Sequence, residues 1–235
     1  MNAAPVIAID GPSGSGKGTV ARRVAAELGF HLLDSGALYR LTALAAERRD
    51  IDTADVPGLV RAAREMEVSF GSGPDAEEVW LDGEEVGAPL RTEECGRLAS
   101  RIAAMPEVRA ALKDRQRDFR TPPGLVADGR DMGTAIFPEA ELKIFLTASA
   151  EERARRRYKQ LKEKGIDVTL SGLAHAIAER DRRDSERSVA PLAPADDAIV
   201  IDSTSLDIDQ VTAEVLGLAA ERLGNGARGS SGRTG

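Results

Sequence analysis

The chain has 235 residues and a formal net charge of −7, with a pI of about 5.1. This length favours one α/β domain that carries insertions over two large domains. The acidic balance argues against proteins that coat nucleic acids or bind membrane surfaces, since both need a positive surface, so we expect neither partner. The single cysteine, Cys95, excludes an intrachain disulfide framework and any metal cluster built from several cysteines.

Hydropathy gives an expectation about where the protein works. No stretch of about 18 apolar residues occurs in the chain, and the first residues lack the basic start and apolar core of a signal peptide. These observations predict a soluble protein of the cytoplasm. We expect it to act as a monomer on small molecules.

A phosphate-binding loop is predicted near the start of the chain. The apolar run Val6 to Asp10 suits a buried strand, residues 11–19 are rich in glycine, and a helical run, Val20 to Leu28, follows. Backbone N–H groups at the start of such a helix, with the positive end of its dipole, bind phosphate oxygens. Lys17 would add a mobile cation. The sequence therefore predicts a nucleotide phosphate site built mostly from backbone.

The pattern of this loop departs slightly from its common form. Gly11, Gly16 and Lys17 match Gly-x-x-x-x-Gly-Lys, but the next position is Gly18 instead of Ser or Thr, and Thr19 comes one residue later. A glycine-rich turn with a lysine in solvent is the alternative. We favour the phosphate site because strand, loop and helix follow in the order that it requires.

A second strand and a polar motif come next. Residues 31–34 read as a strand, and Ser35, Tyr39 and Arg40 follow directly after it. Ligands gather at strand ends in α/β folds, so these three side chains are candidates for binding.

The region from about residue 50 to 97 predicts a small inserted subdomain. It has turn formers at 71–74 and short strands at 68–70 and 79–81, and Asp82-Gly83 is a hairpin signal. Trp80 is interpreted as an apolar anchor of this small sheet in preference to a residue that stacks on a base.

Helix formers return from Thr92 to Phe119, with a break at Pro106, and an apolar strand follows from Leu125. Most charges on the helical segment are interpreted as solvated. Arg130 and Asp131 stand just past the end of the strand. If the strands are parallel, that end lies where the phosphate loop emerges, so this pair is a candidate site; a surface ion pair is the alternative.

Two charged helices are predicted after a strand at 142–146. In the helix at 151–164, Arg153, Arg156 and Arg157 share one face, whereas Arg155 points elsewhere.

The next helix, at 170–187, places Arg180, Asp184 and Arg187 on one face, where two guanidiniums could clamp an anion beside a carboxylate. A solvated helix end is the alternative.

The end of the chain completes the predicted fold. A last strand spans 197–202, an amphipathic helix spans 208–223, and residues 224–235 are expected to be disordered. Five strands that alternate with helices predict a three-layer α/β fold with a five-stranded parallel sheet.

The residue types present favour phosphoryl transfer. Neither of the two histidines stands in a Ser/His/Asp setting, and no His/Cys/Asp cluster would cage zinc. A phosphate acceptor is already ionised near pH 7, so no general base is needed, and catalysis reduces to the alignment of two anions and the neutralisation of charge. One lysine and several arginines can supply that.

Five motifs in order resemble the cytidylate kinase family of nucleoside monophosphate kinases, over about residues 3–223. They are GPSGSGKGT at 11–19, LDSGALYR at 33–40, DGRDMGT at 128–134, ERDRRDSER at 179–187 and APLAPADDAIVIDST at 190–204. Gly18-Thr19 is also the usual form in this family. The resemblance implies transfer of a phosphoryl group from ATP to CMP or dCMP, with Mg²⁺ bridging the donor phosphates and no metal ligand assigned among the side chains.

The resemblance also implies a role for each matching residue. The ATP phosphates would be held by Gly11, Ser13, Gly14, Ser15, Gly16, Lys17, Gly18 and Thr19. The CMP phosphate would be held by Arg40, Arg130 and Arg187, and the sugar by Tyr39, Arg180 and Asp184. Cytosine would be read by Ser35, Ser100, Arg109 and Asp131. Catalytic roles would fall to Lys17, Arg130, Arg187 and, in the lid, Arg156 or Arg157.

The family's organisation can be carried over as segments. It implies a P-loop core at about 3–36, 100–150 and 170–223, a monophosphate-binding insertion at about 37–99 and a lid at about 151–169. Two alternatives remain: a kinase for another monophosphate or small acid, such as UMP or shikimate, and a non-catalytic ATP-binding module. The insertion argues against a shikimate kinase, which is smaller. A guanine-reading Asn-Lys-x-Asp motif is impossible because the only asparagines are Asn2 and Asn225.

Overall fold

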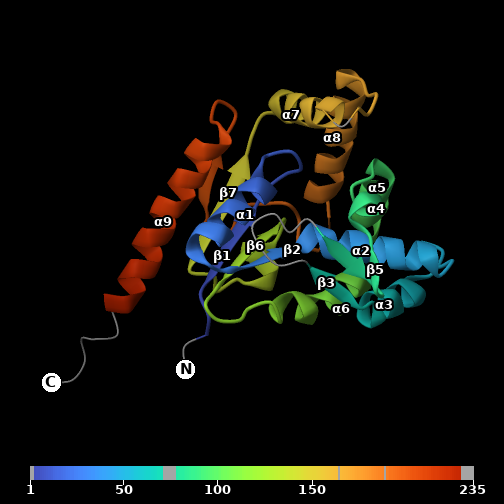
Figure 1. The fold of residues 1–235 in the computed structure, drawn as a ribbon, viewed down its shortest axis with the longest axis horizontal. Helices are drawn as coiled ribbons and strands as arrows, with labels where there is room; N and C mark the ends of the chain where they lie inside the picture. Colours follow the sequence, from blue (N-terminus) through green and yellow to red (C-terminus); the bar gives the residue numbers. More distant parts are fainter. Residues whose placement is uncertain (1–2, 71–77, 164, 188, 229–235) are drawn as a thin grey trace. The chain divides into compact units, whose positions relative to one another are not determined.

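A computed structural model describes residues 3–70, 78–163, 165–187 and 189–228. The chain divides into two compact units, Met1–Leu33 with Phe119–Gly235, and Asp34–Asp118. A parallel sheet with its helices makes up the first unit, and helices with a small antiparallel sheet make up the second (Figure 1). No helix in the described part of the chain is long and apolar enough to cross a membrane.

The predicted five-stranded sheet is confirmed. Its strands, in the order β2-β6-β1-β7-β8, are β2 (His31–Asp34), β6 (Leu125–Gly129), β1 (Val6–Asp10), β7 (Leu142–Thr147) and β8 (Ile199–Asp202). β1 pairs in parallel with both β6 and β7, and β7 pairs in parallel with β8. The first strand of the chain therefore lies at the centre of the sheet.

The register of β1 and β6 decides which loops meet. Asp10, the last residue of β1, pairs with Gly129, the last residue of β6. Because parallel strands end at the same edge of a sheet, the loop after Asp10 and the loop after Gly129 leave the sheet side by side. The first is the phosphate loop and the second begins with Arg130.

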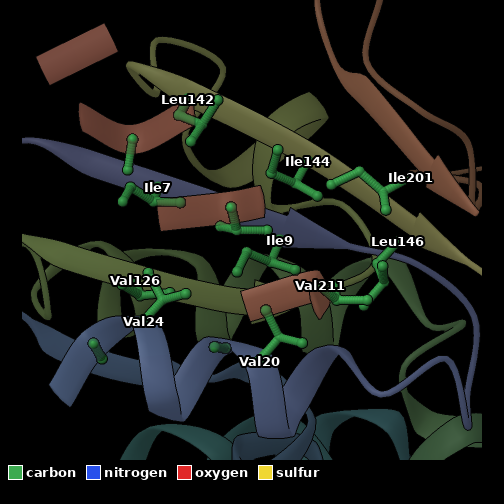
Figure 2. Packing of buried hydrophobic residues seen from close by; sticks show 14 residues of the cluster. Ile7, Ile9, Val20, Val24, Val126, Leu142, Ile144, Leu146, Ile201 and Val211 are labelled. Atoms are coloured by element: carbon green, nitrogen blue, oxygen red, sulfur yellow. The ribbon is translucent and has the colours of Figure 1, made fainter. Parts of the chain in front are cut away.

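The core lies between one face of this sheet and the helices α1 (Lys17–Leu28) and α9 (Ile208–Arg228). Figure 2 shows Ile7 and Ile9 of β1 packed among apolar side chains of α1, α9 and the neighbouring strands. Strand side chains alternate between faces, so Ala8 and Asp10 point to the opposite face. Asp10 is therefore the polar end of a strand that is otherwise apolar.

Helix boundaries differ from the prediction at several ends. α1 begins at Lys17, before the predicted start at Val20. The prediction missed these residues because the first turn of the helix is polar and shows no apolar periodicity. The helix ends at Leu28, as predicted, and Gly29, whose φ of 64° is left-handed, caps it. α9 continues to Arg228, past the predicted end at residue 223, while residues 229–235 of the predicted tail lie outside the described residues.

The remaining helices of the first unit follow the predicted order. α7 (Ala150–Glu163) and α8 (Leu170–Ser185) pack against each other (Figure 1). Residue 164 of the helix predicted at 151–164 lies outside the described residues. A short π-helical turn, η1 (Met132–Ile136), follows β6 and contacts β1. Such a turn has no simple periodicity, and the sequence did not predict it.

The second unit contains most of the predicted insertion. Its helices are α2 (Ser35–Arg48), α3 (Val56–Glu65), α4 (Gly87–Leu90), α5 (Glu93–Ile102) and α6 (Pro106–Arg117). Its sheet is antiparallel, with β3 (Val68–Phe70), β4 (Val79–Leu81) and β5 (Glu84–Glu85). The turn predicted at 71–74 lies outside the described residues.

The hairpin prediction at Asp82-Gly83 is confirmed, and the interpretation of Trp80 is wrong. Asp82 and Gly83 both have positive φ, 51° and 84°, as a tight turn between twisted strands requires. Trp80 is 38% exposed, whereas Leu81 is fully buried. Neighbouring strand residues face opposite sides, and the small sheet buries the side of Leu81. Leu81, not Trp80, is the apolar anchor.

Candidate functional site

The phosphate loop has the geometry that its sequence predicts. A Cβ at Gly11 would lie 2.0 Å from the carbonyl oxygen of Leu146 on β7, so no side chain fits there. Gly16 has a φ of 93° and leads directly into α1. Lys17, the first residue of α1, is buried, and its Nζ donates to the carbonyl oxygen of Pro12 at 3.2 Å. The helix N-terminus and its cation thus face the loop.

Groups behind the loop hold its carbonyl oxygens. Arg153 donates to the carbonyl of Ser13 at 3.0 Å, and Arg156 donates to the carbonyl of Ser15 at 3.3 Å. The hydroxyl of Ser203, which follows β8, also lies 3.2 Å from the carbonyl of Ser15. In a trans peptide the next N–H points opposite to the carbonyl. The N–H groups that follow are therefore turned away from the arginines, as anion binding needs.

Exposure separates Arg155 from Arg153 and Arg156 among the arginines of α7. The side chain of Arg155 is 71% exposed, whereas that of Arg153 is 6% exposed and donates to Asp181 at 2.5 Å. Arg156 also donates to the hydroxyl of Ser203 at 3.1 Å. Arg157 donates to Gln160 at 2.6 Å. In this structure Arg153 and Arg156 both donate hydrogen bonds to backbone carbonyls of the phosphate loop.

A cluster of cations surrounds Asp184 in the same unit. The carboxylate of Asp184 is 1% exposed and accepts from Arg130 at 3.1 Å and from Arg187. Nε of Arg180 lies 4.0 Å from it. Three guanidiniums around one carboxylate leave a net charge of about +2, which matches a phosphate dianion. The predicted trio is brought together, although α8 ends at Ser185 and Arg187 lies just beyond it, and Arg130 joins the trio; we call these four residues the arginine cluster.

Three buried carboxyl groups stand at the ends of the central strands: Asp10 on β1, Asp128 on β6 and Asp131 just beyond β6. The pKa of Asp10 is raised to about 7, chiefly by burial; hydrogen bonds from the backbone of Gly133 and Met132 lower it in part, and the nearby charges of Asp131 and Asp128 add to the rise. Sequence reasoning named only Asp131. An acidic residue at the end of each of two apolar strands was the signal that could have found the others.

The candidate residues of the second unit gather on its helices α2, α5 and α6. Ser35 begins α2, is buried, and donates its hydroxyl hydrogen to Oε1 of Gln116 at 2.7 Å. The Oγ of Ser100 on α5 is buried and has no hydrogen-bond partner in the structure. Arg109 on α6 is buried and donates to the carbonyl of Ala103 at 3.2 Å. Gln116, which orients Ser35, was missed because nothing in its sequence setting distinguishes it.

Arg40 and Tyr39 lie near the start of α2. Nη1 of Arg40 donates to the carbonyls of Leu90, at 2.6 Å, and Thr92, at 3.2 Å, so backbone groups at the end of α4 and just after it fix its guanidinium. A Cβ at Gly96 would lie 2.9 Å from Nη2 of Arg40, so the glycine gives that guanidinium room. Tyr39 is buried.

Comparison with known proteins gives the family. The sequence matches the cytidylate kinase family over residues 7–221. The chain belongs to this family. Cytidylate kinase of Aeromonas hydrophila is 56% identical over 222 residues, which cover 94% of this chain and 96% of that protein. The cytidylate kinases of Nitrosococcus oceani and Bordetella bronchiseptica are 59% and 58% identical over 214 residues, covering 90% and 91% of this chain and 94% of each relative.

Family membership confirms the resemblance read from the motifs. The glycine at position 18 has a local reason. A Cβ there would lie 3.0 Å from Oδ2 of Asp128, so the carboxylate occupies the space beside the first turn of α1 that a side chain would need. A Ser or Thr at this position commonly contributes its hydroxyl to Mg²⁺.

The donor set near the loop is compatible with a cation that the nucleotide brings. Within the described ranges, no group of three or more His, Cys, Asp or Glu residues could hold a metal. The carboxylate of Asp128 beside Gly18 is a hard oxygen donor of the kind that Mg²⁺ prefers, and Mg²⁺ usually takes one or two carboxylates together with substrate phosphates. The residues present therefore fit Mg²⁺ bound mainly to phosphate.

Proposed function

We propose that the chain transfers the γ-phosphoryl group of ATP to CMP or dCMP, which gives ADP and CDP or dCDP. Membership of the cytidylate kinase family carries this proposal. The geometry agrees with it, because the phosphate loop and the loop that begins with Arg130 leave one sheet edge side by side. An enzyme that joins two phosphates needs two such neighbouring anion sites.

The chemical step needs charge stabilisation more than proton transfer. The acceptor phosphate of CMP is ionised near neutral pH, so no general base is required. We propose that the loop N–H groups and Lys17 bind the donor phosphates, with the ATP ligands Gly11, Ser13, Gly14, Ser15, Gly16, Gly18 and Thr19. Arg130 and Arg187 would hold the acceptor phosphate, since the arginine cluster carries the net positive charge that a dianion needs.

Magnesium fits this arrangement as a companion of ATP. When bound to the donor phosphates, Mg²⁺ supplies charge neutralisation. Asp128 is the side chain that would face it, because its carboxylate lies beside the first turn of α1.

The residues proposed to recognise the base are polar and buried. Cytosine has an exocyclic amine that donates to a carboxylate, which suits Asp131, and acceptors at N3 and O2 that suit Ser35, Ser100 and Arg109. The unpartnered Oγ of buried Ser100 supports this role, since such a group is satisfied when a ligand binds. Tyr39, Arg180 and Asp184 would line the sugar, and Arg40 would add to the phosphate contacts.

The lid role of α7 and the following loop is also a proposal. Arg156 or Arg157 would cover the transferring phosphoryl group and exclude water. To do so, Arg156 would have to exchange its present bonds to the carbonyl of Ser15 and to Ser203 for the phosphoryl oxygens. We propose that the enzyme works as a monomer in the cytoplasm; light scattering of the purified protein and fractionation of cells test these two points.

One assay separates the proposed function from its alternatives. ADP release is measured with ATP and Mg²⁺ in the presence of CMP, dCMP, UMP, AMP or GMP, one at a time. We expect release with CMP and dCMP, weaker release with UMP and none with the purine nucleotides. Strongest release with UMP would make the chain a different monophosphate kinase. ATP binding without release in any mixture would favour the non-catalytic module.

A further inference from the structure

Asp10 has no role in the reaction described so far, although it stands where β1 becomes the phosphate loop. Its carboxylate is buried and accepts two backbone hydrogen bonds, from N–H of Met132 to Oδ1 and from N–H of Gly133 to Oδ2, each 2.8 Å long. These two N–H groups belong to the first turn of η1. The carboxylate of Asp10 thus links the start of the phosphate loop to the start of η1.

The first turn of η1 depends on this external group. Asp131 precedes η1, and its own side chain makes no capping hydrogen bond there. Helix starts leave N–H groups without partners inside the helix, and a carboxylate at that end satisfies them with charge-assisted bonds. Asp10 therefore does for η1 what an N-cap residue normally does, but it does so from the neighbouring strand.

The surroundings fit a carboxylate that holds the loop closely. A Cβ at Gly133 would lie 3.5 Å from Oδ2 of Asp10 and 3.1 Å from Cδ of Lys143, so the glycine allows the loop to approach. The charged groups nearby are Asp128 and Asp131, together with Lys143 on β7, whose Nζ pairs with Asp197 at 2.9 Å. The carboxyl group of Asp10 thus lies next to two other acids, which is an unfavourable place for a charge, and the N–H groups of Met132 and Gly133 offset part of that cost.

We propose that Asp10 is a positioning residue that fixes Arg130 and Asp131 relative to the phosphate loop, and thereby sets the affinity and base selectivity of the acceptor site. The two residues immediately precede the N–H groups that Asp10 holds, so a shift of η1 moves both. In this proposal Asp10 acts only through the two hydrogen bonds that it accepts from the loop. The inference deepens the proposed function and rests on it for the identity of the acceptor.

The test compares Asp10→Asn with Asp197→Asn in the full-length chain. Asparagine keeps the size of the side chain but turns one acceptor into a donor, which opposes one of the two N–H groups. We expect faster hydrogen exchange at Met132 and Gly133, a KM for CMP raised by about tenfold, a CMP-to-UMP selectivity lowered by about tenfold, and a KM for ATP changed by less than about threefold. Asp197→Asn removes a nearby charge without touching these bonds and should leave all four quantities within about twofold.

Several results would overturn the proposal. Unchanged exchange at Met132 and Gly133 would mean that Asp10 does not hold the loop, and unchanged KM and selectivity despite faster exchange would mean that the loop position does not matter. If Asp10→Asn does not fold, Asp10→Ser, whose hydroxyl is too short to reach both N–H groups, takes its place with the same expectations. If the wild-type chain does not phosphorylate CMP, the proposed function fails, and exchange together with calorimetric binding of CMP and UMP still decides on Asp10.

Discussion

The pKa of Asp10 predicts an unusual dependence of stability on pH. An acid whose pKa is higher in the folded state binds its proton more tightly there, so it stabilises the fold at low pH and loses that effect as pH rises. For Asp10 the pKa rises from 3.8 to about 7, mainly through burial. Asp10→Asn removes this titration, because an amide stays neutral and resembles the protonated acid.

The size of the effect follows from linkage. Each pKa unit corresponds to about 1.4 kcal/mol, so a shift from 3.8 to about 7 is worth about 4 kcal/mol over the whole titration. About 3 kcal/mol of this change in the free energy of unfolding falls between pH 5 and pH 8. We expect the free energy of unfolding of Asp10→Asn, taken relative to that of wild type, to rise by about 3 kcal/mol from pH 5 to pH 8.

Urea denaturation at pH 5, 6, 7 and 8 measures this difference, and titrations of other groups largely cancel between the two proteins. A difference that stays constant with pH would refute the reasoning, as would a variant that becomes less stable as pH rises.

Three further substitutions test the site. Lys17→Met should lower kcat by at least about a hundredfold with the fold intact, and a folded variant with normal turnover in the ADP assay would contradict the role of Lys17. Asp131→Asn should lower the CMP-to-UMP ratio of kcat/KM by about tenfold, and an unchanged ratio would exclude Asp131 from base reading. Asp184→Asn should lower the free energy of unfolding by about 3 kcal/mol in urea, because three guanidiniums lose a buried partner. Asp209→Asn, which breaks the exposed pair with Arg23, is the control and should cost less than about 0.5 kcal/mol.

The sheet could be predicted because its strands are short apolar runs bounded by glycine and polar residues, and the phosphate loop because its glycines stand between a strand and a helix. The arginine cluster was predictable in part: helical spacing places Arg180, Asp184 and Arg187 on one face, and parallel strands bring Arg130 to the edge of the sheet. Their common carboxylate was not predictable from spacing, since Arg130 comes from 54 positions away in the sequence.

Contacts that depend on a distant backbone atom gave no sequence signal. In the sequence Asp10 is only the polar end of a strand. The folded chain shows that two N–H groups of η1 donate hydrogen bonds to its carboxylate. Arg153 and Arg156 were grouped correctly on one face, but their carbonyl partners in the phosphate loop come from the other end of the chain. Trp80 was misjudged because strand periodicity gives two faces and does not say which one is buried.

The distribution of charge explains how an acidic protein can bind two polyanions. Asp184 gathers three guanidiniums that would otherwise repel one another, and Asp181 and Glu152 hold Arg153 and Arg156 behind the phosphate loop. Each carboxylate fixes the direction of a long side chain before any nucleotide arrives, which lowers the entropy lost on binding. An arginine paired in this way contributes less net charge, but its guanidinium is held in one orientation. Phosphoryl transfer depends on such orientation because the attacking and leaving oxygens must lie in line. If the proposed site residues bind the nucleotides, the acids of the site therefore contribute to its affinity for phosphate.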